Sequence, residues 1–114
     1  MEETLYDTSE IIEIVARLRR RIPGYVSILS IIEYPPVLEY ASKILYPKVK
    51  DYHLALKWQT ILRRKGSILP AVDLVIAAQA YNNNLTLITR DKHFEILKRE
   101  AVPDLKLLVL GKKE

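Results

Sequence analysis

The chain contains no cysteine and only two histidines, His53 and His93. Without cysteine it can form neither a disulfide framework nor a thiolate metal site. With so few imidazole groups it also offers a poor ligand set for zinc. Any metal that it binds would have to be a hard cation held by carboxylate oxygens, which favours Mg²⁺ or Mn²⁺.

Long apolar runs, linkers, internal repeats and low-complexity segments are also missing. No apolar run approaches the roughly 18 residues that a membrane-spanning helix needs, and the start Met1-Glu2-Glu3 is acidic where a signal peptide is basic. The length of 114 residues is common for one domain, and 49% apolar with 28% charged residues is typical of a globular protein. We therefore expect a single domain, residues 1–114, that is cytoplasmic.

The stretch from Leu5 to Ile12 (LYDTSEII) is the pattern around which the rest of the chain is organised. Two apolar residues end in Asp7, small polar residues follow, and apolar residues then recur at helical spacing. This pattern predicts a strand, a turn and a helix. In an open α/β sheet the turn after the first strand lies near the centre, at the edge where ligands bind. The alternative is that Asp7 caps the helix, with Glu10 completing a capping box.

The rest of the chain alternates strands with helices. Strands are predicted at Thr4 to Tyr6, Tyr25 to Leu29, Leu85 to Thr89 and Leu105 to Leu110. Helices are predicted from Ser30, from Pro36 to Leu45 or Tyr46, from Val49 to Lys65, from Pro70 through Ala80, and from Lys92 to Arg99. Alternating strands and helices form a parallel sheet that is covered on both faces. We expect a three-layer α/β/α fold with a central parallel sheet of about four to five strands.

Four acids lie at the ends of these elements. Asp7, Glu33 and Asp91 come just after three of the strands, and Asp73 lies in the first turn of a later helix. Each acid alone is explained as a helix cap, as part of an S-x-x-E capping box opened by Ser30, or as a partner of a helix dipole. Four carboxylates gathered at one edge would repel by up to about 4 kcal/mol per pair unless a cation lies between them. A metal site therefore accounts for all four acids, provided that Asp73 reaches this edge.

Four motifs resemble those of the PIN-domain ribonucleases, and especially of the VapC-like toxins of prokaryotic toxin–antitoxin pairs. The motifs are YDTS with Asp7, SIIE with Glu33, VDLVIAAQA with Asp73 and LITRDKHF with Asp91, and the resemblance covers nearly the whole chain. The last two are fairly specific for this family. The resemblance implies four or five parallel strands, a cluster of these four acids that binds one or two Mg²⁺ or Mn²⁺ ions, and endonucleolytic cleavage of RNA. It also implies a small antitoxin partner and a homodimer.

The chain departs from the family pattern at several points. Many relatives carry a further acid just after the fourth one, where this chain has Lys92 and His93, so a second metal ion would have fewer ligands. The chain is also short for the family, and Pro35-Pro36 beyond Glu33 is unusual. The missing acid supports an alternative hypothesis, a catalytically silent module that binds RNA or protein. A phosphotransfer domain is a third hypothesis, but such domains need a second acid two residues after the first, where this chain has Ser9.

Other polar residues near the acids are candidates for supporting roles. Three basic residues flank Asp91, namely Arg90, Lys92 and His93. We expect one of them to contact a substrate phosphate; the alternative is that they form only a solvated turn. Three hydroxyl residues also lie near the acids, namely Thr8, Ser9 and Thr89. Their hydroxyls would orient the acids, or as exposed turn residues they would have no role. The net charge of +4 gives weak additional support for a polyanionic partner.

Overall fold

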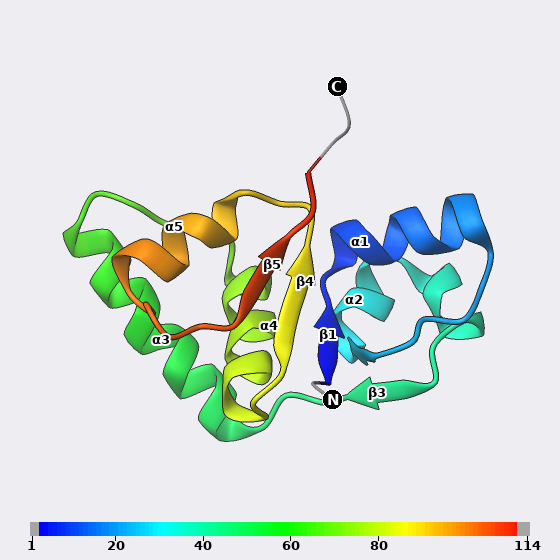
Figure 1. Cartoon of the computed structure of the whole chain (residues 1–114). Helices are drawn as coiled ribbons and strands as arrows, with labels where there is room; N and C mark the ends of the chain where they lie inside the picture. The colour runs from blue at the N-terminus through cyan, green and yellow to red at the C-terminus, as the bar shows by residue number, and fades with distance from the viewer. Residues whose placement is uncertain (1–2, 112–114) are drawn as a thin grey trace.

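A five-stranded parallel sheet forms the centre of the computed structural model, which describes residues 3–111 (Figure 1). The strand order is β3-β2-β1-β4-β5, so β1 (Thr4–Tyr6) is the central strand. The other strands are β2 (Tyr25–Ser27), β3 (Lys43–Leu45), β4 (Thr86–Thr89) and β5 (Leu107–Val109). Leu5 of β1 pairs with Tyr25 on one side and Leu87 on the other. The predicted parallel sheet and the central position of its first strand are confirmed.

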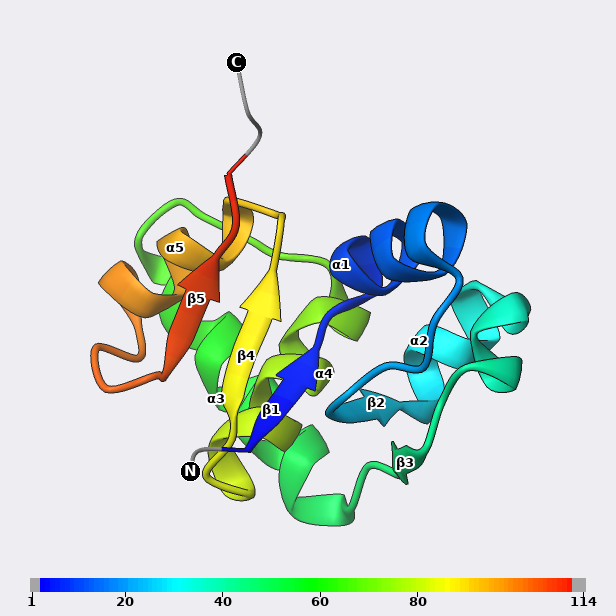
Figure 2. The same cartoon turned by 45° about the vertical axis from the view of Figure 1, so that its right-hand side comes forward.

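Helices cover both faces of the sheet, as Figures 1 and 2 show from two directions. The first face is covered by α1 (Thr8–Glu13), the π-helix η1 (Ile14–Leu18), α2 (Ile28–Glu33) and the 3-10 helix η2 (Pro35–Glu39). The second face is covered by α3 (Val49–Arg64), α4 (Ala71–Asn82) and α5 (His93–Glu100). Val26 belongs to the first apolar cluster, and Leu5 and Leu87 to the second. The sheet therefore separates two cores, which confirms the three-layer fold.

The segment after α2 differs from the sequence prediction. In place of a helix from Pro36 to Leu45 or Tyr46, the chain forms η2 and then β3, which pairs with β2. Paired prolines supply no amide hydrogens for a regular helix, and a three-residue strand is too short to show an alternating pattern. The strands predicted at 25–29 and 105–110 are also shorter in the structure. Within the described part of the chain, no helix combines the length and apolarity needed to span a membrane.

Candidate metal centre

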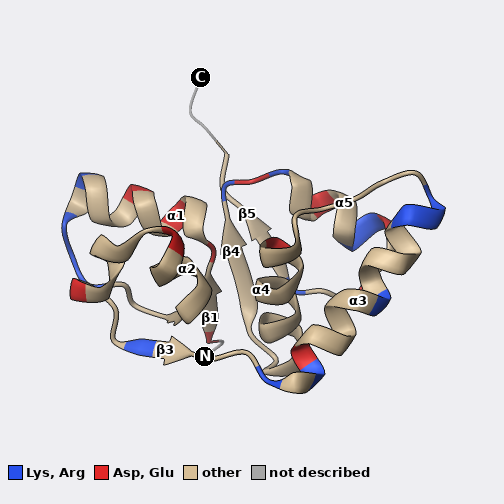
Figure 3. Ribbon diagram, turned by 180° about the vertical axis from the view of Figure 1, so that it is seen from behind, with Lys and Arg blue, Asp and Glu red and all other residues tan. Residues whose placement is uncertain are grey.

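The carboxyl ends of β1 and β4 form the edge at which the predicted acids gather. From β1 the chain proceeds to β2 and β3 on one side and then crosses to β4 on the other side, so the direction of the strand order reverses between β1 and β4. Open α/β sheets bind ligands at such a reversal. Asp7 directly follows β1, and Asp91 lies two residues after β4. In Figure 3, acidic segments lie at this end of the sheet, at the start of α4 and between β4 and α5.

Asp7 is buried, with 3% of its surface exposed. Its Oδ2 accepts hydrogen bonds from Thr89 Oγ1 at 2.8 Å and Ser9 Oγ at 2.9 Å, and its side chain also caps α1 by accepting from the Ser9 amide at 3.4 Å. Its Oδ1 is buried and has no hydrogen-bond partner among residues 3–111. A buried carboxylate oxygen without a donor is unfavourable, and a bound cation would compensate for it. Asp7 thus caps α1 with one carboxylate oxygen and leaves the other without a donor.

The capping box expected between Asp7 and Glu10 is wrong. The Asp7 amide, which the box requires as a donor, instead continues the sheet by donating to the Ile88 carbonyl at 2.8 Å. Glu10 Oε1 accepts a hydrogen bond from Arg90 Nε at 2.6 Å. Sequence reasoning missed this partner of Glu10. Glu10 and Arg90 follow β1 and β4, which are neighbours in the sheet. Only the order of the strands reveals this, so the sequence held no signal for the pair.

Glu33 is connected to the start of α1 through Thr8. Thr8 Oγ1 donates to Glu33 Oε1 at 2.8 Å and lies 2.7 Å from Ser30 Oγ. The predicted capping box of Ser30 and Glu33 is wrong, because Ser27 caps α2 by accepting from the Leu29 amide at 3.1 Å. Ser30 is therefore buried within α2, and Glu33 is its last, exposed residue. The Ser30 hydroxyl therefore contacts Thr8 and does not cap the helix.

Asp73 interacts electrostatically with the other three acids. It lies in the first turn of α4, which runs from the carboxyl edge of the sheet back to the start of β4 (Figure 3). Burial and the negative charges of Asp7, Asp91 and Glu33 raise the pKa of Asp73 from 3.8 to about 6, against a smaller lowering effect of His93. The sequence left open whether Asp73 reaches this edge. Its interactions with the other acids place it there.

The four carboxylates do not form a closed ligand set. Among residues 3–111, no group of three aspartate, glutamate or histidine side chains is arranged to hold a metal ion. Oδ1 of Asp91 already accepts from the His93 amide at 2.9 Å and lies 2.7 Å from His93 Nδ1. The fit to a hard cation rests on the all-oxygen donor set and on the unpaired Oδ1 of Asp7.

The three basic residues beside Asp91 have different surroundings. Arg90 is bound to Glu10, and His93 is bound to Asp91. Lys92 is exposed and belongs to none of the ion pairs formed within residues 3–111. Of the three, Lys92 is the one whose charged group is exposed and outside these ion pairs, so it is the one available to a phosphate group.

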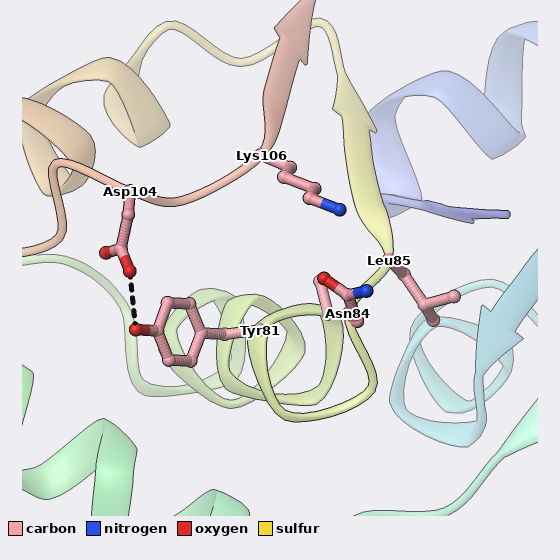
Figure 4. Close-up of a pocket in the computed structure, with 6 residues that line it drawn as sticks. Tyr81, Asn84, Leu85, Asp104 and Lys106 are labelled. Atoms are coloured by element: carbon pink, nitrogen blue, oxygen red, sulfur yellow. Dashed lines mark hydrogen bonds between the residues drawn. The ribbon is translucent and has the colours of Figure 1, made fainter. Parts of the chain in front are cut away.

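A cavity of about 390 Å³ lies at the opposite edge of the sheet (Figure 4). It is lined by Ala80, Tyr81, Asn84, Leu85, Asp104 and Lys106, which end α4 or precede β4 and β5. Tyr81 Oη donates to Asp104 Oδ2 at 2.8 Å across this cavity. Since parallel sheets bind ligands at their carboxyl edge, the acid cluster is the candidate site and this cavity is not.

Asp73→Asn should stabilise the metal-free protein at pH 8 and much less at pH 4. The pKa of Asp73 is about 6 in the folded protein against an ordinary 3.8, so folding becomes less favourable as the pH rises between these values. The full shift corresponds to at most about 3 kcal/mol, and solvent screening of this half-buried group reduces the cost to about 1–2 kcal/mol. Urea unfolding in EDTA at both pH values measures the difference. An equal effect of the substitution at both would contradict the charge coupling.

Comparisons with known proteins agree with this architecture. The family model for the PIN domain matches residues 4–100. A chain of DNA-bound VapBC from Salmonella typhimurium has a TM-score of 0.72 and 17% identity, covering 96% of this chain and 98% of that one. A chain of VapBC-1 from nontypeable Haemophilus influenzae has a TM-score of 0.67 and 21% identity, covering 93% and 96%. A chain of a toxin–antitoxin complex from Klebsiella pneumoniae has a TM-score of 0.59 and 15% identity, covering 94% and 97%. The curated proteins include no match.

Proposed function

Because this chain belongs to the PIN-domain family, we propose that it is a metal-dependent endoribonuclease and the toxin of a toxin–antitoxin pair. The observation that carries the proposal is the electrostatic coupling of Asp7, Glu33 and Asp91 to Asp73 at the carboxyl edge of the sheet. The reaction would be hydrolysis of an RNA phosphodiester bond. Similarity to chains of VapBC and toxin–antitoxin complexes supports the toxin role through the shared fold.

The four acids would hold Mg²⁺ or Mn²⁺ as the catalytic cofactor. When bound, such an ion activates water and neutralises the charge that develops on the phosphate. Asp7 would offer its unpaired Oδ1, while Ser9 and Thr89 fix the other carboxylate oxygen. Thr8 would orient Glu33 in the same way. Hydroxyls that hold a ligand from behind in this manner fix its orientation.

The direct test is the metal dependence of cleavage by the purified protein. We expect single-stranded RNA to be cut in the presence of Mg²⁺ or Mn²⁺, and not in EDTA or with Ca²⁺ alone, because the donor set is suited to small hard cations that support phosphoryl chemistry. Gel electrophoresis of end-labelled RNA measures the products. Equal cleavage in chelator would rule out the proposed mechanism.

Binding of RNA should weaken as the salt concentration rises, because the proposed contacts are to phosphates. For single strands, each phosphate contact contributes about −0.7 to the slope of the logarithm of affinity against the logarithm of salt concentration. Lys92→Ala should therefore make this slope less negative by about 0.7. Lys57→Ala, which alters an exposed lysine on α3, is the matched control. Fluorescence anisotropy in EDTA measures the slope without cleavage, and a flat response would count against RNA as the ligand.

A small antitoxin and a second copy of the chain are the proposed partners. The toxin–antitoxin complex among the similar structures supports the antitoxin, whereas the second copy rests on the family resemblance alone. Light scattering would measure the oligomeric state, and co-purification with the product of a small upstream reading frame would test the antitoxin. The cytoplasmic location expected from the sequence stays a prediction.

The alternative function is a catalytically silent PIN-like module that binds RNA or protein. Two observations favour it: Lys92 and His93 stand where many relatives have an acid, and His93 engages Asp91. RNA binding without cleavage under any divalent metal would support this alternative.

A further inference from the structure

We propose that Glu10 and Arg90 act as a positioning pair that holds Asp91 beside Asp7. Arg90 Nε donates to Glu10 Oε1 at 2.6 Å and joins α1 to the segment after β4, across 80 positions of the sequence. The inference rests on the proposed function, because it concerns how the cation ligands are held. It goes beyond that function by giving a role to two residues outside the acid cluster.

The Glu10–Arg90 pair is more buried than the other pair on the same helix. The side chains of Glu10 and Arg90 are 11% and 33% exposed, whereas those of Glu13 and Arg17 are 35% and 74% exposed. Both pairs line one shallow pocket of about 270 Å³ along α1 and η1. A carboxylate as buried as that of Glu10 must keep its partner, so the pair is a persistent link between the two segments.

Two further hydrogen bonds join the same segments. The Arg90 amide donates to Ser9 Oγ at 2.9 Å, and Thr89 Oγ1 donates to Asp7 Oδ2 at 2.8 Å. Within the segment after β4, the Asp91 amide donates to Thr89 Oγ1 at 2.9 Å. The bond between Arg90 and Glu10 is the one in which both partners are charged, and such bonds are stronger than neutral ones. It is therefore the one ion pair that joins α1 to the segment that carries Asp91 in the described part of the chain.

The place of the Asp91 carboxylate in the cluster depends on the links between the two segments, to which the Glu10–Arg90 pair contributes the ion pair. Its Oδ1 is bound by the amide and ring of His93, which belongs to the same segment and cannot hold that segment against β1. The separation of Asp91 from Asp7 is therefore set by links between the segments. Loss of residues that orient metal ligands typically weakens metal affinity by about 10- to 100-fold. We expect a loss of this order here.

Titration of Mg²⁺ into the variant Glu10→Gln tests the proposal without using activity. Glutamine keeps the size of the side chain but removes the charge, so we expect the Mg²⁺ dissociation constant to rise about 10-fold. Isothermal titration calorimetry measures the constant at a temperature where circular dichroism shows the variant to be folded. Glu13→Gln, which breaks the exposed pair of the same type, is the control and should bind Mg²⁺ as the wild type does. If Glu10→Gln does not fold, Arg90→Lys removes the Nε donor and keeps the charge.

The double variant Glu10→Leu with Arg90→Met separates positioning from stability. It leaves no buried charge unpaired, so its melting temperature in EDTA should exceed that of Glu10→Gln. Its affinity for Mg²⁺ should stay reduced, because the directed bond is still missing. Wild-type affinity in Glu10→Gln or in the double variant would overturn the positioning role alone. A wild type that binds no Mg²⁺ would overturn the proposed function and the positioning role together.

Discussion

Asp7→Asn should reduce the rate of RNA cleavage by about 10³ while the protein remains folded. A bound metal ion supplies several kcal/mol of transition-state stabilisation, and about 1.4 kcal/mol corresponds to a tenfold change in rate. Asparagine caps a helix about as well as aspartate, and its carbonyl oxygen can still accept from Ser9 and Thr89. The substitution also removes one of the charges that raise the pKa of Asp73, so the melting temperature in EDTA should be unchanged or higher.

The matched control is Asp104→Asn, which alters an exposed aspartate at the opposite edge of the sheet. It should cleave RNA at the wild-type rate, and an equal loss of activity in both variants would mean that the acid cluster is not the site.

Mg²⁺ should raise the melting temperature of the wild type, because a ligand that binds only the folded state stabilises it. Mg²⁺ should hardly change the melting temperature of the Asp91→Ala variant. An equal response of the wild type and Asp91→Ala would show that these acids do not hold the ion.

Phe94→Ala should lower the free energy of unfolding by about 3–5 kcal/mol. Phe94 lies in the first turn of α5, has no exposed surface and belongs to the apolar cluster on the second face of the sheet. Its removal leaves a cavity that the neighbouring side chains fill only in part. The loss would also loosen the turn that carries Asp91, so Mg²⁺ affinity should fall with stability.

Urea unfolding of Phe94→Ala and of Tyr46→Ala measures this contribution. Tyr46 is also aromatic but is 63% exposed, so its truncation should change the free energy of unfolding by less than about 0.5 kcal/mol. Equal effects of the two substitutions would contradict the packing of α5 against the sheet.

Local patterns predicted the elements that have strong end signals. The strand at Thr4–Tyr6 and the helix beginning at Val49 are found where they were expected, and Gly66, with a φ of +80°, follows α3 where a helix stop was expected. Apolar periodicity, glycine and proline act within a few residues, so one sequence suffices to place such elements. The strand β3 was missed because its three residues contain no periodicity and owe their conformation to pairing with β2.

The identity of the helix caps depended on tertiary contacts. The stretch SILS presents two serines three positions apart, and either could begin a helix by its local preference. The pairing of Ser27 with Leu45 makes it the last residue of β2, which leaves Ser30 inside α2 beside Thr8. In the same way, pairing with β4 uses the Asp7 amide and frees Glu10 to bind Arg90.

By itself, the sequence determined the α/β class, the parallel sheet and the identity of the candidate acids, because alternation, composition and the position of acids after strands are local properties. Only the tertiary structure decided that Asp73 joins the other three acids, that Oδ1 of Asp7 is buried without a donor, and that Glu10 binds Arg90. These features depend on the order of the strands and on the crossing of α4 over the sheet. They bring together residues that are far apart in the sequence, such as Glu10 and Arg90 at a separation of 80 positions, and no local preference encodes such a separation.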